Sequence, residues 1–135
     1  LMAVDKLPKA IPYTYIRFSD WRGGIIMQKA QSSMGPTQAG ILLLAIATAA
    51  IHIYLAIPEN LTMFYLNGLG YIVLALALFV PQLKQYRGLI RYALMAFTLV
   101  TIIGWVAIGM RTPIAYIDKI IEVGLLVLLW LDRGR

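Results

Sequence analysis

Four long apolar runs dominate the chain and predict its architecture. They cover residues 39–57, 61–80, 89–110 and 114–131. A helix needs about 20 mostly apolar residues to cross a bilayer core of roughly 30 Å, and the runs are close to that length. Proline breaks helices, and Pro58 and Pro81 follow the first two runs directly. The pattern therefore predicts an all-α membrane protein with four transmembrane helices.

The fourth run is the least apolar of the four. It contains Asp118, Lys119 and Glu122, and its uninterrupted apolar part extends only from Val123 to Leu131. Ionisable side chains are costly inside a bilayer, at roughly 2.5–3.5 kcal/mol each on insertion scales. A buried or interfacial helix is therefore an alternative interpretation of this run.

The connections between the runs are short, spanning residues 58–60, 81–88 and 111–113. Short connections require neighbouring helices to be antiparallel. We therefore expect residues 39–135 to form one antiparallel four-helix transmembrane domain.

The basic residues predict the orientation of this domain. Of the 12 lysines and arginines, ten lie before the first run, in or beside the 81–88 connection, or at the C-terminus, and two lie on the other side. Basic segments close to the ends of spans stay in the cytoplasm. Both termini and the 81–88 connection are therefore predicted to be cytoplasmic. Anionic lipid is a sufficient partner for the net charge of +6, so nucleic acid is not an expected partner.

The composition limits the chemistry of a single copy. The chain has no cysteine and one histidine, while 61% of its residues are hydrophobic and 13% are charged. Disulfides, thiol nucleophiles, iron–sulfur clusters and multi-histidine metal sites are thereby excluded within one copy. We expect no catalytic residues and no intrinsic cofactor.

Residues 1–38 differ in kind from the rest of the chain. Pro8, Pro12 and the pair Gly23–Gly24 prevent one long helix. Aromatic and basic side chains alternate here, and the segment is predicted to be a peripheral cytoplasmic arm rather than a cleavable signal peptide. It either lies at headgroup level or docks on a larger neighbouring subunit. The residues that make up the predicted docking arm are Tyr13, Tyr15, Arg17, Phe18, Trp21 and Arg22.

The strongly polar residues of the predicted spans lie at similar depth. At a rise of about 1.5 Å per residue, each is in the outer half of the membrane. This candidate polar cluster consists of His52, Asn67, Trp105, Asp118, Lys119 and Glu122. It either marks a functional site or is a packing device, because residues three and four positions apart, such as Lys119 and Glu122, can compensate each other's charge.

His52 has three interpretations. It forms a satisfied hydrogen bond between helices, handles protons together with Glu122, or ligates a pigment or haem. The last is disfavoured, since a bis-histidine haem needs a second histidine from another chain. A contact with lipid or quinone is compatible with the cluster. In the first span, the small and polar stripe Ala45, Thr48, Ala49, His52 and Ala56 is predicted to face protein.

Three features carry a resemblance to a known class of proteins: the stretch 64–71 (FYLNGLGY), His52 and Tyr54 before Pro58, and Trp105. Over residues 39–131 the chain resembles small, uncharacterised four-span membrane proteins of prokaryotes. This resemblance implies a prokaryotic cytoplasmic (inner) membrane and assigns no catalytic residue. In size, topology and possession of an arm, the chain is also similar to accessory membrane subunits of bacterial quinol oxidoreductases of the alternative complex III type.

Two functions remain open at this point. The first is a non-catalytic accessory subunit of a respiratory or photosynthetic electron-transfer complex, which stabilises assembly and binds lipid or quinone. Its partners are larger membrane subunits and anionic lipids. The alternative is a small homo-oligomeric, proton-coupled transporter or channel. The absence of glycine-broken spans in two related halves favours the first function.

Overall fold

The computed structural model describes residues 34–132, whose regular elements are all helical. In this range the chain forms four α-helices and one 3-10 helix, and no strand. The elements are α2 (Pro36–Glu59), α3 (Thr62–Ala77), η1 (Pro81–Tyr86), α4 (Arg87–Ile108) and α5 (Pro113–Leu131). The predicted all-α class is confirmed.

Prolines and caps define where the helices begin. Pro36 and Pro113 occupy the first positions of α2 and α5, where the missing N–H has no intrahelical partner to lose. The side chain of Thr112 caps α5 by accepting a hydrogen bond from the N–H of Ala115 at 3.4 Å. These local signals start both helices within three residues of the ranges that the apolar runs predict.

The turn between α2 and α3 begins later than predicted, because the predicted connection began at Pro58 and α2 ends at Glu59. Pro58 does not end α2 but lies within its last turn, and the helix continues to Glu59. Asn60 then adopts a left-handed conformation with φ 48°, and its N–H donates to the carbonyl of Ala56. Asparagine tolerates this conformation better than most residues, and it allows the chain to reverse at once.

The segment between the second and third helices differs from the prediction. The second apolar run extends to residue 80, but α3 ends at Ala77. Residues 81–88 were expected to be a connecting loop, but Pro81–Tyr86 form η1, and α4 begins directly afterwards at Arg87. Proline at the first position of η1 favours this short helix over an open loop.

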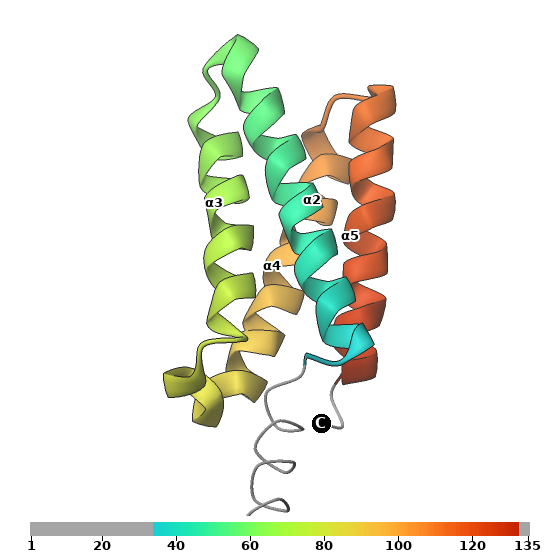
Figure 1. Ribbon diagram of the computed structural model, residues 1–135. Helices are drawn as coiled ribbons and strands as arrows, with labels where there is room; N and C mark the ends of the chain where they lie inside the picture. Colours follow the sequence, from blue (N-terminus) through green and yellow to red (C-terminus); the bar gives the residue numbers. More distant parts are fainter. Residues whose placement is uncertain (1–33, 133–135) are drawn as a thin grey trace, which may run out of the picture. The chain divides into compact units, whose positions relative to one another are not determined.

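The four α-helices lie side by side, and the chain passes along successive helices in opposite directions (Figure 1). Helix α2 contacts α3 and α5, and α4 contacts the same two helices. The α2–α3 and α4–α5 turns consequently lie at one end of the four described α-helices, and η1 lies at the other.

Small residues bring α2 and α3 close together. The predicted small and polar stripe of α2 is buried along its whole length, as expected for a face that packs against protein. Gly68 of α3 faces this stripe, where an added Cβ would lie 2.9 Å from the Ala49 carbonyl oxygen and 2.7 Å from Cγ1 of Ile53. The two backbones approach this closely because Gly68 has no side chain.

Two helical stretches of the described range are long and apolar enough to cross a membrane. These are Pro36–Glu59 and the continuous stretch Pro81–Ile108, which joins η1 to α4. Helix α3 is apolar but has only 16 residues, and α5 has 19 residues with three charged side chains. Large apolar side chains are exposed on all four helices.

We expect Gly68→Ala to lower the free energy of unfolding by about 1–3 kcal/mol, because the new methyl group overpacks the α2–α3 contact. The measurement is equilibrium unfolding in mixed detergent micelles with increasing sodium dodecyl sulfate. Gly88→Ala is the matched control, since nothing lies within 4 Å of an added Cβ at that helical position. Equal stability of the two variants would contradict a close α2–α3 approach.

Candidate functional site

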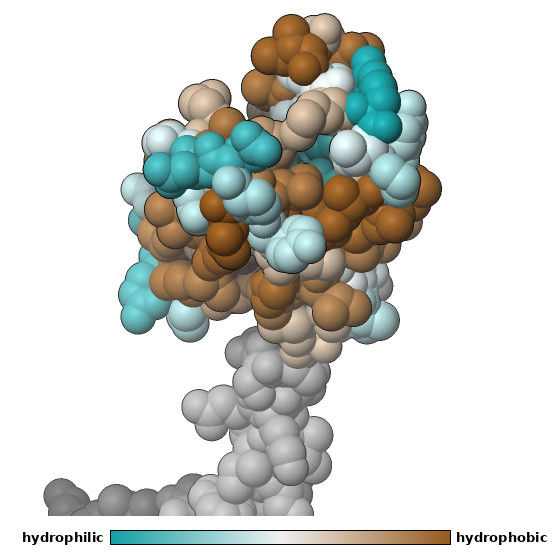
Figure 2. Space-filling model, turned by 90° about the horizontal axis from the view of Figure 1, so that it is seen from above, coloured by the Kyte–Doolittle hydropathy of each residue, from teal (hydrophilic) through white to brown (hydrophobic). Residues whose placement is uncertain are grey.

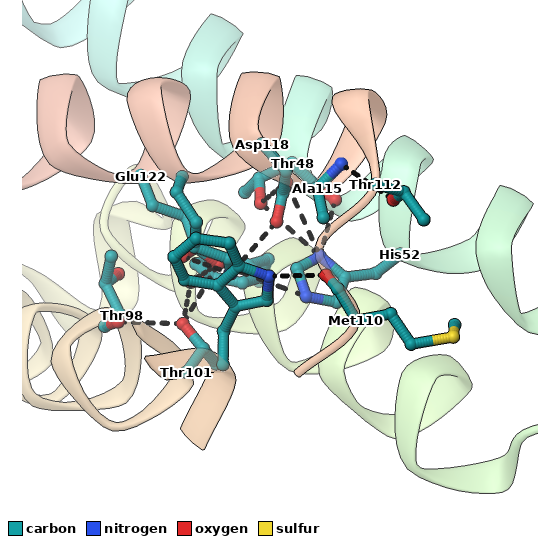
Figure 3. A network of polar contacts seen from close by, with 12 residues as sticks. Thr48, His52, Thr98, Thr101, Met110, Thr112, Ala115, Asp118 and Glu122 are labelled. Carbon is teal, nitrogen blue, oxygen red and sulfur yellow. Dashed lines mark hydrogen bonds and ion pairs between the residues drawn. The ribbon is translucent and has the colours of Figure 1, made fainter. Parts of the chain in front are cut away.

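The titratable residues His52, Asp118 and Glu122 lie together in the interior. Their exposed fractions are 4%, 2% and 0%. His52 projects from α2, and the two carboxylates project from one face of α5, since positions four apart lie above each other on a helix. Figure 3 shows these side chains directed toward one another between the helices.

Asp118 is connected to α2 through Thr48. The Thr48 hydroxyl donates to Oδ1 of Asp118 at 2.6 Å. His52 Nδ1 lies 2.9 Å from the backbone carbonyl oxygen of Thr48 and 3.8 Å from Asp118 Oδ1. A carbonyl oxygen can only accept, so Nδ1 carries a hydrogen and donates it. The neutral imidazole therefore has its unprotonated nitrogen at Nε2.

Glu122 is connected to the other two helices. Its Oε1 accepts hydrogen bonds from the Tyr71 hydroxyl of α3 at 2.8 Å and from the Thr101 hydroxyl of α4 at 2.9 Å. Tyr71 and Thr101 are also 2.8 Å apart. His52 Nε2 lies 4.0 Å from the same carboxylate oxygen, beyond hydrogen-bond distance.

Lys119 bridges the two carboxylates. Its Nζ lies 2.6 Å from Glu122 Oε2 and 3.1 Å from Asp118 Oδ2. Two carboxylates and one ammonium leave one formal negative charge when His52 is neutral. Burial strengthens these ion pairs and also makes the loss of either partner costly.

The structure brings together four residues of the predicted cluster, and places the other two nearby. The carboxylates of Asp118 and Glu122 each lie within 4.0 Å of both His52 and Lys119. Asn67 and Trp105 instead line an adjoining pocket. Trp105 Nε1 donates to the Met110 carbonyl oxygen at 3.0 Å, and its ring packs edge-on against Tyr116.

The predicted docking arm lies outside the described residues. This applies to Tyr13, Tyr15, Arg17, Phe18, Trp21 and Arg22. Docking by these residues remains a prediction.

Three hydroxyl residues complete the cluster but were not among its predicted members. Thr48 was expected only in the small and polar stripe of the first span, and Tyr71 only in the stretch that carries the resemblance. A signal existed for Thr48, which lies four residues before His52 and so shares its face. Tyr71 and Thr101 reach Glu122 across the bundle, which spacing within one helix does not reveal.

A pocket of about 590 Å³ adjoins the cluster. It lies toward the end where α2 meets α3 and α4 meets α5, and its lining is mostly apolar. Figure 2 looks down on this end, where hydrophobic and hydrophilic residues are interspersed. The polar residues of the cluster that line it are His52, Thr101, Asp118 and Lys119. Pockets of this size, with few polar groups in an apolar wall, are typical of small-molecule sites.

The cluster also contains ligand types that bind metal ions. His52, Asp118 and Glu122 each offer one ligand atom, and these atoms lie within 4.8 Å of one another. However, the ammonium of Lys119 already lies between the two carboxylates. A divalent cation must therefore compete with a built-in positive charge, which disfavours a resident metal.

A second polar group lies at the opposite end and was not predicted. Asp132, 5% exposed, follows α5 directly. Its carboxylate lies 3.7 Å from Arg87, and its backbone carbonyl accepts a hydrogen bond from Arg91 at 3.3 Å. These contacts join the start of α4 to the end of α5.

Comparison with known proteins identifies no relative: no family model matches the sequence, and no curated protein or solved structure shows detectable similarity. Inference about function therefore rests on the geometry of the cluster and pocket.

We expect Thr48→Val to lower the free energy of unfolding by about 1.5–3 kcal/mol, because the buried Asp118 carboxylate loses a hydrogen bond. Thr98→Val is the control. Thr98 is as fully buried, but its hydroxyl donates to the Leu94 carbonyl of its own helix rather than to a charge. The same unfolding measurement in mixed micelles compares the two. Equal losses of stability would contradict a special contribution from the Thr48–Asp118 bond.

Proposed function

We propose that the chain is a four-span protein of the prokaryotic cytoplasmic membrane, with its helices antiparallel and both termini cytoplasmic. The distribution of side chains on α3 and α5 supports this proposal. Tyr71 of α3 and the three charged residues of α5 lie in the cluster, and both helices expose apolar residues, including Leu69 and Val73 on α3 and Ile120 and Val127 on α5. Such an arrangement suits a helix surrounded by lipid, whose ionisable residues face the bundle interior.

The charged residues of α5 do not prevent it from spanning. Asp118 and Glu122 are buried, and Lys119 is bound to both of them. The charges that lower the hydropathy of α5 therefore do not face lipid. The distribution of basic residues supports the orientation, since Lys84, Arg87 and Arg91 flank the turn between α3 and α4.

Cysteine labelling tests this topology, and the absence of native cysteine makes single-cysteine variants unambiguous. We expect Glu59→Cys to react with a membrane-impermeant maleimide in intact cells, and Gln85→Cys to react only after lysis. Glu59 is preferable to its neighbour Asn60, whose positive φ disfavours cysteine. Labelling in the reverse pattern would show that the orientation is wrong.

We further propose that the protein is a non-catalytic accessory subunit of a membrane energy-conversion complex that binds a small apolar molecule, such as lipid or quinone. The observation that carries this proposal is the pocket whose mostly apolar wall ends at the buried charged cluster. With one histidine and no cysteine, the chain offers few ligands for a redox centre of its own. A binding and stabilising role is consistent with both observations.

A proton-coupled transporter or channel is the second candidate. It is favoured by the buried His52–Glu122 pair and by the single negative charge that remains beside Lys119. Uptake of one proton neutralises that charge, and the pocket gives the cluster access toward one end of the molecule. This function requires a homo-oligomer or monomer that works without larger subunits.

Native purification distinguishes the two candidates. We expect the full chain, extracted in mild detergent, to migrate with larger subunits that absorb as haem or iron–sulfur proteins. Deletion of residues 1–29 should leave the bundle in the membrane and release it from that complex, because the arm is the predicted docking segment. Migration as a homo-oligomer would favour the transporter. Unchanged co-purification after the deletion would exclude docking by the arm.

A further inference from the structure

Nε2 of His52, a residue that lines the pocket, has no hydrogen-bond partner among the described residues. His52 is 4% exposed and lines the pocket. Its Nδ1 is bound to the Thr48 carbonyl, whereas Nε2 forms no hydrogen bond to any residue that the structure describes. The nearest polar group to Nε2 among those contacts is Glu122 Oε1 at 4.0 Å. Nε2 retains some accessible surface, because the fully buried side-chain atoms without a partner in residues 34–132 are Arg91 Nε and Asp132 Oδ1, so a ligand group in the pocket can be its partner.

The bond at Nδ1 determines what this partner must be. Because Nδ1 donates its hydrogen to the Thr48 carbonyl, neutral His52 presents an unprotonated Nε2. This nitrogen accepts a hydrogen bond and does not donate one. The ligand group that faces it must therefore carry a hydroxyl or N–H, and a carbonyl or ether oxygen cannot replace it.

The charge of the cluster restricts the ligand further. Asp118, Glu122 and Lys119 together carry one formal negative charge, which repels an anionic headgroup. A cationic headgroup must compete with Lys119 for both carboxylates. A neutral headgroup meets neither penalty.

The side chains that line the pocket indicate the chemistry of the rest of the ligand. Phe64 and Trp105 are aromatic, and the Phe64 ring centroid lies 5.8 Å from that of His52. Leu55, Met63 and Ile108 add aliphatic surface. Aromatic walls favour a flat ring near the polar end, through offset or edge contacts, and the aliphatic surface accommodates an apolar tail.

We propose that this pocket binds a neutral phenol-type or hydroquinone-type headgroup with an apolar tail, and that its hydroxyl donates to Nε2 of His52. The inference rests on the proposed function and names the ligand class of that site. Lys119 and Asn67 also line the pocket and provide donors for ligand oxygens. The site prefers the hydroxyl form of a ring over a form without the donor.

A matched pair of small probes tests the hydroxyl preference without redox chemistry. 4-Octylphenol and its methyl ether, 4-octylanisole, share the ring and tail and differ in the donor, and a phenol stays protonated at neutral pH. The binding measurement uses the full chain in lipid nanodiscs with the substitutions Trp21→Phe and Trp130→Phe. These leave Trp105, which lines the pocket, as the tryptophan whose fluorescence reports binding. Empty nanodiscs correct for partitioning of each probe into lipid.

We expect saturable binding of 4-octylphenol, at least tenfold tighter than that of 4-octylanisole. His52→Leu, which removes the acceptor, should make the two affinities equal, and Thr98→Val, outside the pocket lining, should keep the difference. 4-Octylbenzoate, which is anionic at neutral pH, should bind at least tenfold more weakly than the phenol.

Several results would overturn the inference. These are equal affinities for phenol and ether in the protein with native His52, a phenol preference that persists in His52→Leu, benzoate binding as tight as phenol, or no saturable binding of any probe. If His52→Leu does not fold, the comparison of phenol with ether in the protein with native His52 decides alone. None of these results alters migration with larger subunits, so the proposed subunit role is tested separately.

Discussion

The structure depends on the need to stabilise two carboxylates inside an apolar bundle. An isolated carboxylate away from water is costly, so each oxygen requires a cation or a hydroxyl. Lys119 serves both carboxylates, Thr48 of α2 serves Asp118, and Tyr71 of α3 and Thr101 of α4 serve Glu122. All four α-helices therefore contribute to one polar cluster, which fixes their rotation and register more specifically than apolar contacts do.

The same arrangement explains why a pocket lies beside the cluster. Helix α2 offers small residues toward its neighbours, and Gly68 lets α3 approach it closely. The C-terminal part of α4 instead carries Trp105, which donates a hydrogen bond to the backbone of Met110 and packs against Tyr116 rather than entering the cluster. Close packing on one side of the bundle and large side chains on the other leave space next to the charged residues.

Structural and functional roles of the cluster are compatible. The contacts of Asp118 and Glu122 hold the helices together, and Lys119 compensates one of their two formal negative charges. His52 is different, because one ring nitrogen is used within α2 and the other is not. His52, which lines the pocket, therefore has a ring nitrogen that packing does not use, and a binding role for that nitrogen is compatible with stability.

The sequence by itself determined where the four α-helices lie and that Asp118 and Glu122 share a helix face. Apolar run length and proline positions located all four α-helices to within three residues at each end, and the i, i+4 spacing placed Asp118 and Glu122 on one buried face. Helix periodicity reports which residues share a face of one helix, but not which faces meet. Only the tertiary structure decided that Tyr71 and Thr101 bind Glu122, that Asn67 and Trp105 line a pocket instead, and that Asp132 contacts Arg91, because each of these contacts joins different helices.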